Sequence, residues 1–259
     1  MERLGRAIAM LPTAVVVLAV TVIAGCTAKD TAPRGDPCLP GPCRPDVTAV
    51  ADVRLAELYC TAARSVSLDI SYLMDQRPTP SDQLSWSAAD VDYVVAKAAQ
   101  AVDTADWPAY RCCLFTARTG MQRDPQWVPI YQKALTSPRR EKVALDHGYA
   151  LHETLRMLGQ ANSAEAAALL VQASQAAFWG APFAGQVLGA GTKDTLVHLR
   201  SVAVSALGLM DAEISLPILQ TMADQYPNKQ PVAKPSSEYE FEDGAGYQIQ
   251  KLINEINAR

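Results

Sequence analysis

The sequence is poor in the residues and spacings on which the commonest hydrolases depend. It contains three histidines, His147, His152 and His198. Neither Gly-x-Ser-x-Gly nor Ser-x-x-Lys occurs, so the commonest serine hydrolase signatures are absent. Four residues after His152, where the helix of a zinc protease carries its second histidine, the chain has Arg156. The sequence therefore indicates no catalytic centre of these familiar kinds.

Basic charge is also in short supply. The chain has 23 lysines and arginines against 27 aspartates and glutamates, which gives a formal net charge of −4. A nucleic-acid-binding surface needs an excess of basic side chains to displace the counterions of the phosphates. The composition predicts no nucleic-acid partner.

A long apolar run is present at the amino terminus. It extends from Ala7 to Gly25 and follows Arg3 and Arg6. A basic start before such a run is typical of a targeting segment that takes no part in the fold. An uncleaved transmembrane anchor remains an alternative, because about 19 apolar residues just span a bilayer. An ordinary secretory signal is a second alternative.

The apolar run ends in Ile23-Ala24-Gly25-Cys26, which resembles the lipobox of bacterial lipoproteins, with isoleucine where leucine is commoner. The resemblance implies cleavage before Cys26, a diacylglycerol on its thiol and attachment to a membrane through lipid. We expect a signal peptide over residues 1–25 and a lipid-anchored body in the periplasm or at the cell surface. Thr27 stands where an aspartate resembles an inner-membrane retention signal, which favours the outer membrane over the cell membrane.

The other five cysteines are an odd number, although an exported protein can form disulfides. They are Cys38, Cys43, Cys60, Cys112 and Cys113. Residues 26–46 are rich in proline and predict an extended tether. Cys38 and Cys43 enclose Leu-Pro-Gly-Pro, so a bridge across this turn is favoured, with Cys60 to Cys112 or Cys113 as a second choice. The remaining pairings are open. The paired spacings of a zinc site are missing, so neither a metal nor another cofactor is expected.

Helical periodicity dominates the body and predicts an all-α fold. In the N-terminal helical region, over 47–106, Ser87 with Asp90 three residues later predicts a helix start. The helix then runs to Asp103 with one apolar stripe. A second helix is expected from Asp106 to about Thr119, also with one stripe. Val47 to Ala63 predicts an earlier helix, and residues 65–72 alternate like a strand, although helix is preferred.

Three glycines, Gly120, Gly159 and Gly208, each follow one helical stripe and precede another, 39 and 49 residues apart. Such spacing predicts stacked helical pairs over 107–226. The third unit resembles a HEAT repeat of the short bacterial type, with its places filled by Arg200, Ala203, Leu207, Gly208, Asp211, Pro217 and Leu219. In the first unit Pro129 lies nine residues after its glycine, as Pro217 does in the third. The resemblance implies stacked hairpins in a HEAT-like α-solenoid.

The last segment, 227–259, predicts a polar linker followed by a capping helix over Gly246–Ala258. Ile249, Leu252, Ile253 and Ile256 are expected to point inward.

The function expected from these features is that of a lipid-anchored, non-enzymatic scaffold. Its partners would be the membrane, through Cys26, and another protein of the cell envelope. The alternative is an envelope hydrolase that uses His147 and His152 with a carboxylate such as Asp146 or Glu153.

Overall fold

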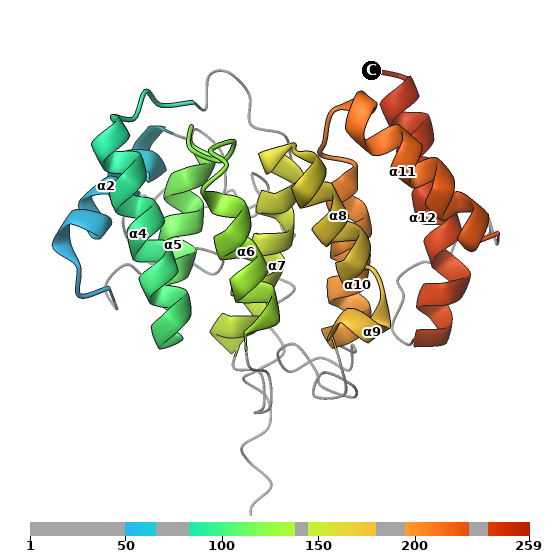
Figure 1. Ribbon diagram of the computed structural model, residues 1–259, viewed down its shortest axis with the longest axis horizontal. Coiled ribbons are helices and arrows are strands. Elements are labelled where there is room, and N and C mark those ends of the chain that lie inside the picture. Colours follow the sequence, from blue (N-terminus) through green and yellow to red (C-terminus); the bar gives the residue numbers. More distant parts are fainter. Residues whose placement is uncertain (1–49, 66–82, 138–144, 180–194, 228–237) are drawn as a thin grey trace, which may run out of the picture.

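A computed structural model describes residues 50–65, 83–137, 145–179, 195–227 and 238–259. All regular structure in these ranges is helical, as predicted (Figure 1). The helices are α2 (Val53–Ser65), α4 (Ala88–Thr104), α5 (Trp107–Arg118), α6 (Trp127–Thr136), α7 (Leu145–Ala161), α8 (Ala164–Ala173), α9 (Ala176–Trp179), α10 (Thr195–Leu207), α11 (Ala212–Gln225) and α12 (Glu238–Asn257). The predicted signal segment and tether, with Cys26, Cys38 and Cys43, and the alternating stretch after Ser65 lie outside the described residues.

The helices are arranged in two rows. In one row, which we call the inner row, α2, α5, α7, α10 and α12 contact one another in that order. In the other, the outer row, α4, α6, α8 and α11 follow in parallel order and lie in front in Figure 1. Each outer helix packs extensively against the inner helix that comes next along the chain: α4 on α5, α6 on α7, α8 on α10 and α11 on α12.

Local capping explains where several helices begin. The side chains of Ser87, Asp106 and Ser163 each accept a hydrogen bond from the backbone N–H three residues further on. Such an acceptor satisfies one of the amide groups that a helix start leaves without an intrahelical partner. The predicted cap at Ser87 is confirmed, and the apolar stripe of α4 is buried as expected, including Val94 and Val102.

The prediction of one apolar stripe on α5 is wrong. Every residue from Ala109 to Arg118 is buried, including Arg111 and Thr116. The physical reason is that α2, α4 and α7 surround this helix on several sides. Its polar side chains are therefore interior groups, a position that sequence periodicity alone does not disclose.

Two of the three predicted turn glycines lie at turns, and the third does not. Gly120 follows α5 with a φ of +135°, and a Cβ there would come within 2.5 Å of the Leu84 carbonyl oxygen. Gly208 ends α10. Gly159, however, lies inside α7, and the chain reverses at Asn162, which has a φ of 55°. Gly159 instead allows α7 to approach the backbone of Ala206 in α10.

The shared offset of Pro129 and Pro217 does not give them equivalent places. Pro129 is the third residue of α6, in the first turn, where its missing N–H costs no helical hydrogen bond. Pro217 lies inside α11. The cause is the longer connection after Gly120, which delays the start of α6 relative to that of α11.

Two predicted helix starts are also corrected. The first described helix begins at Val53, later than the predicted Val47, because Asp52 accepts a hydrogen bond from the backbone N–H of Leu55. The last begins at Glu238 instead of Gly246, so part of the expected polar linker is helical. Its inward face is confirmed, since Ile249, Ile253 and Ile256 are buried and Leu252 is half-buried.

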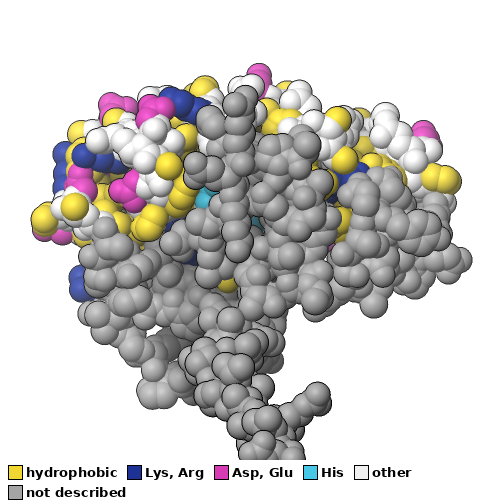
Figure 2. Space-filling model, turned by 90° about the horizontal axis from the view of Figure 1, so that it is seen from below, with side chains coloured by type: hydrophobic (Ala, Val, Ile, Leu, Met, Phe, Trp, Pro, Cys, Tyr) yellow, Lys and Arg dark blue, Asp and Glu magenta, His cyan; other side chains and the backbone are white. Residues whose placement is uncertain are grey.

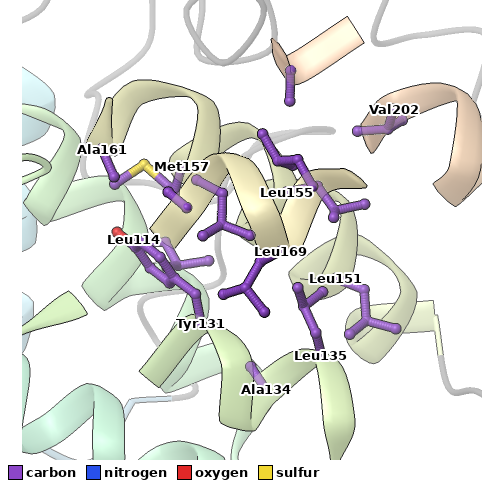
Figure 3. Packing of buried hydrophobic residues seen from close by; sticks show 14 of the residues in the cluster. Leu114, Tyr131, Ala134, Leu135, Leu151, Leu155, Met157, Ala161, Leu169 and Val202 are labelled. Carbon is purple, nitrogen blue, oxygen red and sulfur yellow. The ribbon is translucent and has the colours of Figure 1, made fainter. Parts of the chain in front are cut away.

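One hydrophobic core extends from Leu55 in α2 to Ile256 in α12. In its middle, leucine side chains from α6, α7 and α8, among them Leu135, Leu151 and Leu169, point toward one another (Figure 3). No boundary in the core separates residues before and after position 106, because α4 packs on α5. None of the helices in the described ranges is long and apolar enough to cross a membrane.

Candidate functional site

Polar and aromatic side chains gather on the inner row, and we call this group the inner polar cluster. It comprises Trp107 and Arg111 of α5, His147, Tyr149, His152, Glu153 and Arg156 of α7, and His198 of α10. Residues 149, 152, 153 and 156 share one face of α7 because they are three or four positions apart. The cluster therefore connects three successive helices of one row.

A buried ion pair joins α5 to α7 within this cluster. The Arg111 guanidinium donates from Nε and Nη2 to the two carboxylate oxygens of Glu153, at 2.9 Å and 2.6 Å. Both residues are buried, and the guanidinium also lies 5.1 Å from the ring centre of Tyr149. Two parallel hydrogen bonds of this kind hold both charged groups in one orientation. Both oxygens of the Glu153 carboxylate are thus hydrogen-bonded to Arg111.

A pair of imidazoles joins α7 to α10. His152 Nδ1 and His198 Nε2 are 3.0 Å apart, and the rings are inclined by 20°. Burial lowers the pKa of His152 well below its usual 6.5, and the positive charges possible on His198, Arg156 and Arg111 lower it further. His152 is therefore held neutral at physiological pH.

The two histidines proposed for a hydrolase do not meet. His147 stacks on Trp107 of α5, with ring centres 3.9 Å apart, whereas His152 bonds His198 of α10. The two imidazoles of α7 thus turn toward different neighbouring helices. Glu153 is bound by Arg111, and the side chain of Asp146 is outside the described part. The geometry does not assemble the predicted acid–base grouping.

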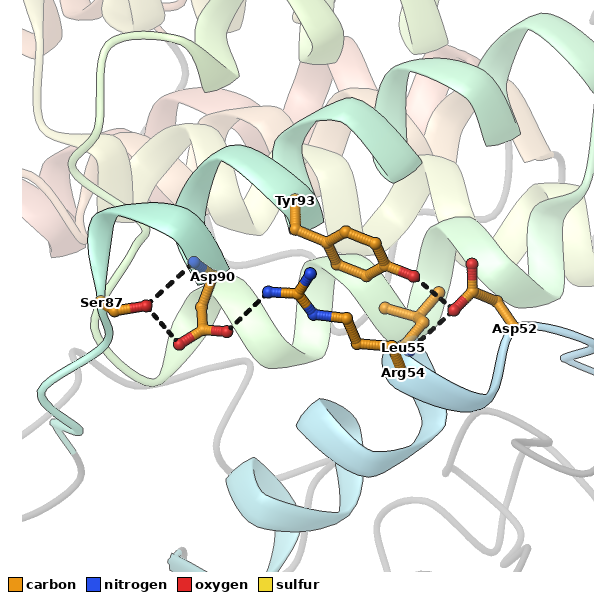
Figure 4. A network of polar contacts seen from close by, with 6 residues as sticks. All are labelled: Asp52, Arg54, Leu55, Ser87, Asp90 and Tyr93. Atoms are coloured by element: carbon orange, nitrogen blue, oxygen red, sulfur yellow. Dashed lines mark hydrogen bonds and ion pairs between the residues drawn. The ribbon is translucent and has the colours of Figure 1, made fainter.

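A second polar network fastens the start of α2 to α4 (Figure 4). The Asp52 carboxylate accepts hydrogen bonds from the Tyr93 hydroxyl and from Lys97 Nζ, the latter at 2.6 Å. Its partial burial opposes ionisation, but the bonds from Lys97 and Tyr93 prevail and lower the pKa of Asp52 to about 2. Arg54 lies 4.1 Å from the ring centre of Tyr93 and reaches Asp90 at 3.2 Å.

The cysteines on α2 and α5 do not form the predicted bridge. Cys60, Cys112 and Cys113 are all thiols. Burial, with the neighbouring Cys112 and Asp52 adding to it, raises the pKa of the Cys113 thiol well above its usual value. Since the thiolate is the reactive form, burial in the core keeps Cys113 in its less reactive thiol form.

The residues expected to mark a repeat have definite structural roles. Arg200 is buried, donates from Nε to the Ser174 carbonyl at 2.6 Å and lies 3.8 Å from the ring centre of Phe241. It thereby joins the carboxyl end of α8 to α10 and α12. Ala203 is fully buried on the same helix.

Asp211 is bonded to the preceding turn. Its backbone N–H donates to Asn162 Oδ1 at 2.7 Å, and Asn162 Nδ2 donates to the Asp211 carboxylate. Asn162 lies in the turn between α7 and α8, next to Ser163, the N-cap of α8, and Asp211 is the N-cap of α11. The bond therefore joins the turns of two successive helical pairs. The role of Asn162 was not predicted.

No group of three metal-binding side chains occurs among the described residues. Seen from below, acidic and basic side chains are interspersed at the α2 and α4 end, and histidine atoms are visible nearer the middle (Figure 2). The chain matches no protein-family model, curated protein or solved structure.

Proposed function

We propose that this chain is a lipid-anchored cell-envelope protein whose HEAT-like α-solenoid binds another envelope protein along α5, α7 and α10. The observation that carries the proposal is the reciprocal bond between Asn162 and Asp211. It links the turns of two neighbouring helical pairs, and contacts between successive units are what hold a stack of repeats together.

The arrangement of the two rows supports a stack of helical pairs, as opposed to a single closed helical bundle. Inner helices contact inner helices in sequence order, and outer helices follow the same order. In such an array a helical pair buries its apolar face only against its neighbours. The close approach of Gly159 to Ala206 and the contacts of Arg200 are interactions of this neighbour-to-neighbour kind.

The outer surfaces of α2 and α12 combine charged side chains with exposed apolar ones. On α12, Lys251 and Glu255 border a surface depression of about 430 Å³ together with Tyr247, which is 40% exposed. On α2, Arg54 and Glu57 are exposed beside Val53. Terminal units of an array need polar faces because no further unit covers them, and these charged side chains supply part of that polarity.

The inner row supplies the proposed binding surface. Trp107 and Tyr149 are half-buried, and Arg156 lies on the same side of the array. Tryptophan, tyrosine and arginine are the residue types that most often dominate the affinity of protein interfaces. The divergence of His147 and His152 toward different helices favours binding over hydrolysis at this place.

Membrane attachment rests on the lipobox-like ending Ile23-Ala24-Gly25-Cys26. Metabolic labelling with radioactive palmitate tests it by comparing the wild type with Cys26→Ala. We expect label and membrane association in the wild type and loss of both in the variant. Equal labelling of the two proteins refutes lipidation at Cys26.

Site-specific photocrosslinking in intact cells tests the binding surface. A photoreactive phenylalanine analogue is placed at Tyr149 or Trp107 on the inner row, and at Gln132, Ala168 or Gln220 on exposed outer-row positions. We expect one discrete adduct of the same mass from both inner positions and none from the outer positions. Adducts from outer positions alone contradict the assignment. Turnover of a substrate that depends on His147 or His152 contradicts the non-enzymatic function.

A further inference from the structure

The imidazoles of His152 and His198 form a contact between two neighbouring inner helices. His152 Nδ1 and His198 Nε2 lie 3.0 Å apart, a normal hydrogen-bond separation. Further along the same pair of helices, Gly159 of α7 approaches the backbone of Ala206 in α10. The contact therefore spans a closely packed interface, where a small separation of the helices breaks it.

A hydrogen bond between two imidazoles needs one N–H and one unprotonated nitrogen. The neutral pair satisfies this requirement, and so does the pair that carries one added proton. Two added protons place an N–H on each of the facing nitrogens and leave neither as an acceptor. The bond is then lost, and two positive charges face each other across α7 and α10.

The surrounding charges strengthen this response. The charged groups that act on His152 are Arg111 of α5, Arg156 of α7 and His198 itself when it is protonated. Glu153 follows His152 on α7, and Arg111 binds both of its carboxylate oxygens. The cations around His152 thus disfavour a second proton on the pair.

We propose that His152 and His198 act as a proton-operated latch, which holds α7 against α10 when at most one added proton is present and releases them when both imidazoles are protonated. The latch goes beyond the proposed binding function and does not depend on it. Release loosens the junction between two helical pairs and changes the spacing of the inner row.

The direction of the pH dependence follows from burial. The pKa of His152 in the folded protein is well below 6.5, because burial and the neighbouring cations disfavour its charged form. A histidine with a lowered pKa stabilises the folded state fully above its unfolded pKa of about 6.5. That stabilisation is lost as the pH falls from about 6.5 through the folded pKa. The latch is closed at neutral pH and opens in acid.

Hydrogen exchange of the full-length protein between pH 7 and pH 4.5, corrected for the intrinsic pH dependence of exchange, tests the latch. We expect exchange in peptides from α7 and α10 to rise roughly tenfold relative to peptides from α4, a factor that corresponds to about 1.4 kcal/mol. The variant His152→Asn/His198→Gln keeps polar groups near the facing nitrogen positions but cannot be protonated, so its α7 and α10 should not respond. His147→Asn, outside the pair, should respond like the wild type.

Histidine NMR titration of the unmutated protein keeps the test independent of how the variants fold. We expect His152 and His198 to titrate as a coupled pair, with the second protonation displaced to lower pH. Independent titration of the two imidazoles at ordinary pKa values overturns the latch. Unchanged pH dependence in the double variant also overturns it. Suppression of the titration by added Zn²⁺ at micromolar concentration refutes the latch in favour of a metal site.

Discussion

Gly159→Ala is expected to destabilise the protein, although alanine is normally the better helix residue. In an exposed helix interior the change stabilises by about 1 kcal/mol. Here the new Cβ comes within 3.0 Å of the Ala206 carbonyl carbon and closer still to its oxygen. Non-bonded heavy atoms prefer about 3.5 Å or more, so α7 and α10 have to separate by about 1 Å. Because backbone has to move, the cost is in the upper part of the roughly 1–3 kcal/mol found for overpacking.

The net expectation is a loss of about 1–2 kcal/mol, which lowers the melting temperature by about 2–8 °C in a protein of this size. Thermal and urea unfolding followed by circular dichroism measure it. Gly208→Ala is the matched control, because its Cβ meets Leu252 Cδ2 at 2.6 Å, the movable end of a side chain. We expect the control to change stability by less than about 1 kcal/mol. A Gly159→Ala protein as stable as the wild type refutes the close packing of α7 on α10.

Three further predictions concern polar groups. Asp52→Asn should lower the free energy of unfolding by about 1–2 kcal/mol at pH 7. The difference from wild type should vanish as the pH falls from about 4 toward 2, because the pKa of Asp52 is about 2 in the folded protein. Unfolding curves at several pH values measure it, and a difference that does not change with pH contradicts it. Removing Arg111 or Glu153 alone should lower the free energy of unfolding by about 3–5 kcal/mol, whereas replacing both with leucine should lower it much less. A double-mutant cycle by urea unfolding measures the difference. Additive losses contradict a coupled pair. Ser87→Ala should lower the free energy of unfolding by about 1 kcal/mol through loss of the α4 cap, as thermal unfolding measures. Ser87→Thr is the control, because its hydroxyl can both accept from the backbone N–H of Asp90 and donate to the Asp90 carboxylate, so it should retain stability.

Local signals were sufficient for much of the helical fold. Ser87 with Asp90 marks the start of α4, and the spacing of Ile249, Ile253 and Ile256 marks the buried face of α12. These features depend on hydrogen bonds within one turn or on a 3.6-residue period, so neighbouring residues are enough to predict them.

The candidate site could be predicted only in part. The histidines were visible as rare residues, but their partners were not, because His198 is 46 residues from His152 and Arg111 is 42 residues from Glu153. Proximity along α7 suggested that His147 and His152 act together, whereas packing directs them to α5 and α10.

By itself, the sequence determined that the described body is helical, where α4 and α5 begin and which face of α12 is buried. Those properties arise from interactions between residues a few positions apart. The tertiary structure decided that α5 is buried on all sides and that Gly159 allows α7 to pack closely on α10. It also decided that the chain turns at Asn162, between α7 and α8, and which histidines meet. Such properties depend on the shape and backbone of a neighbouring helix distant in sequence, and no local pattern contains that neighbour.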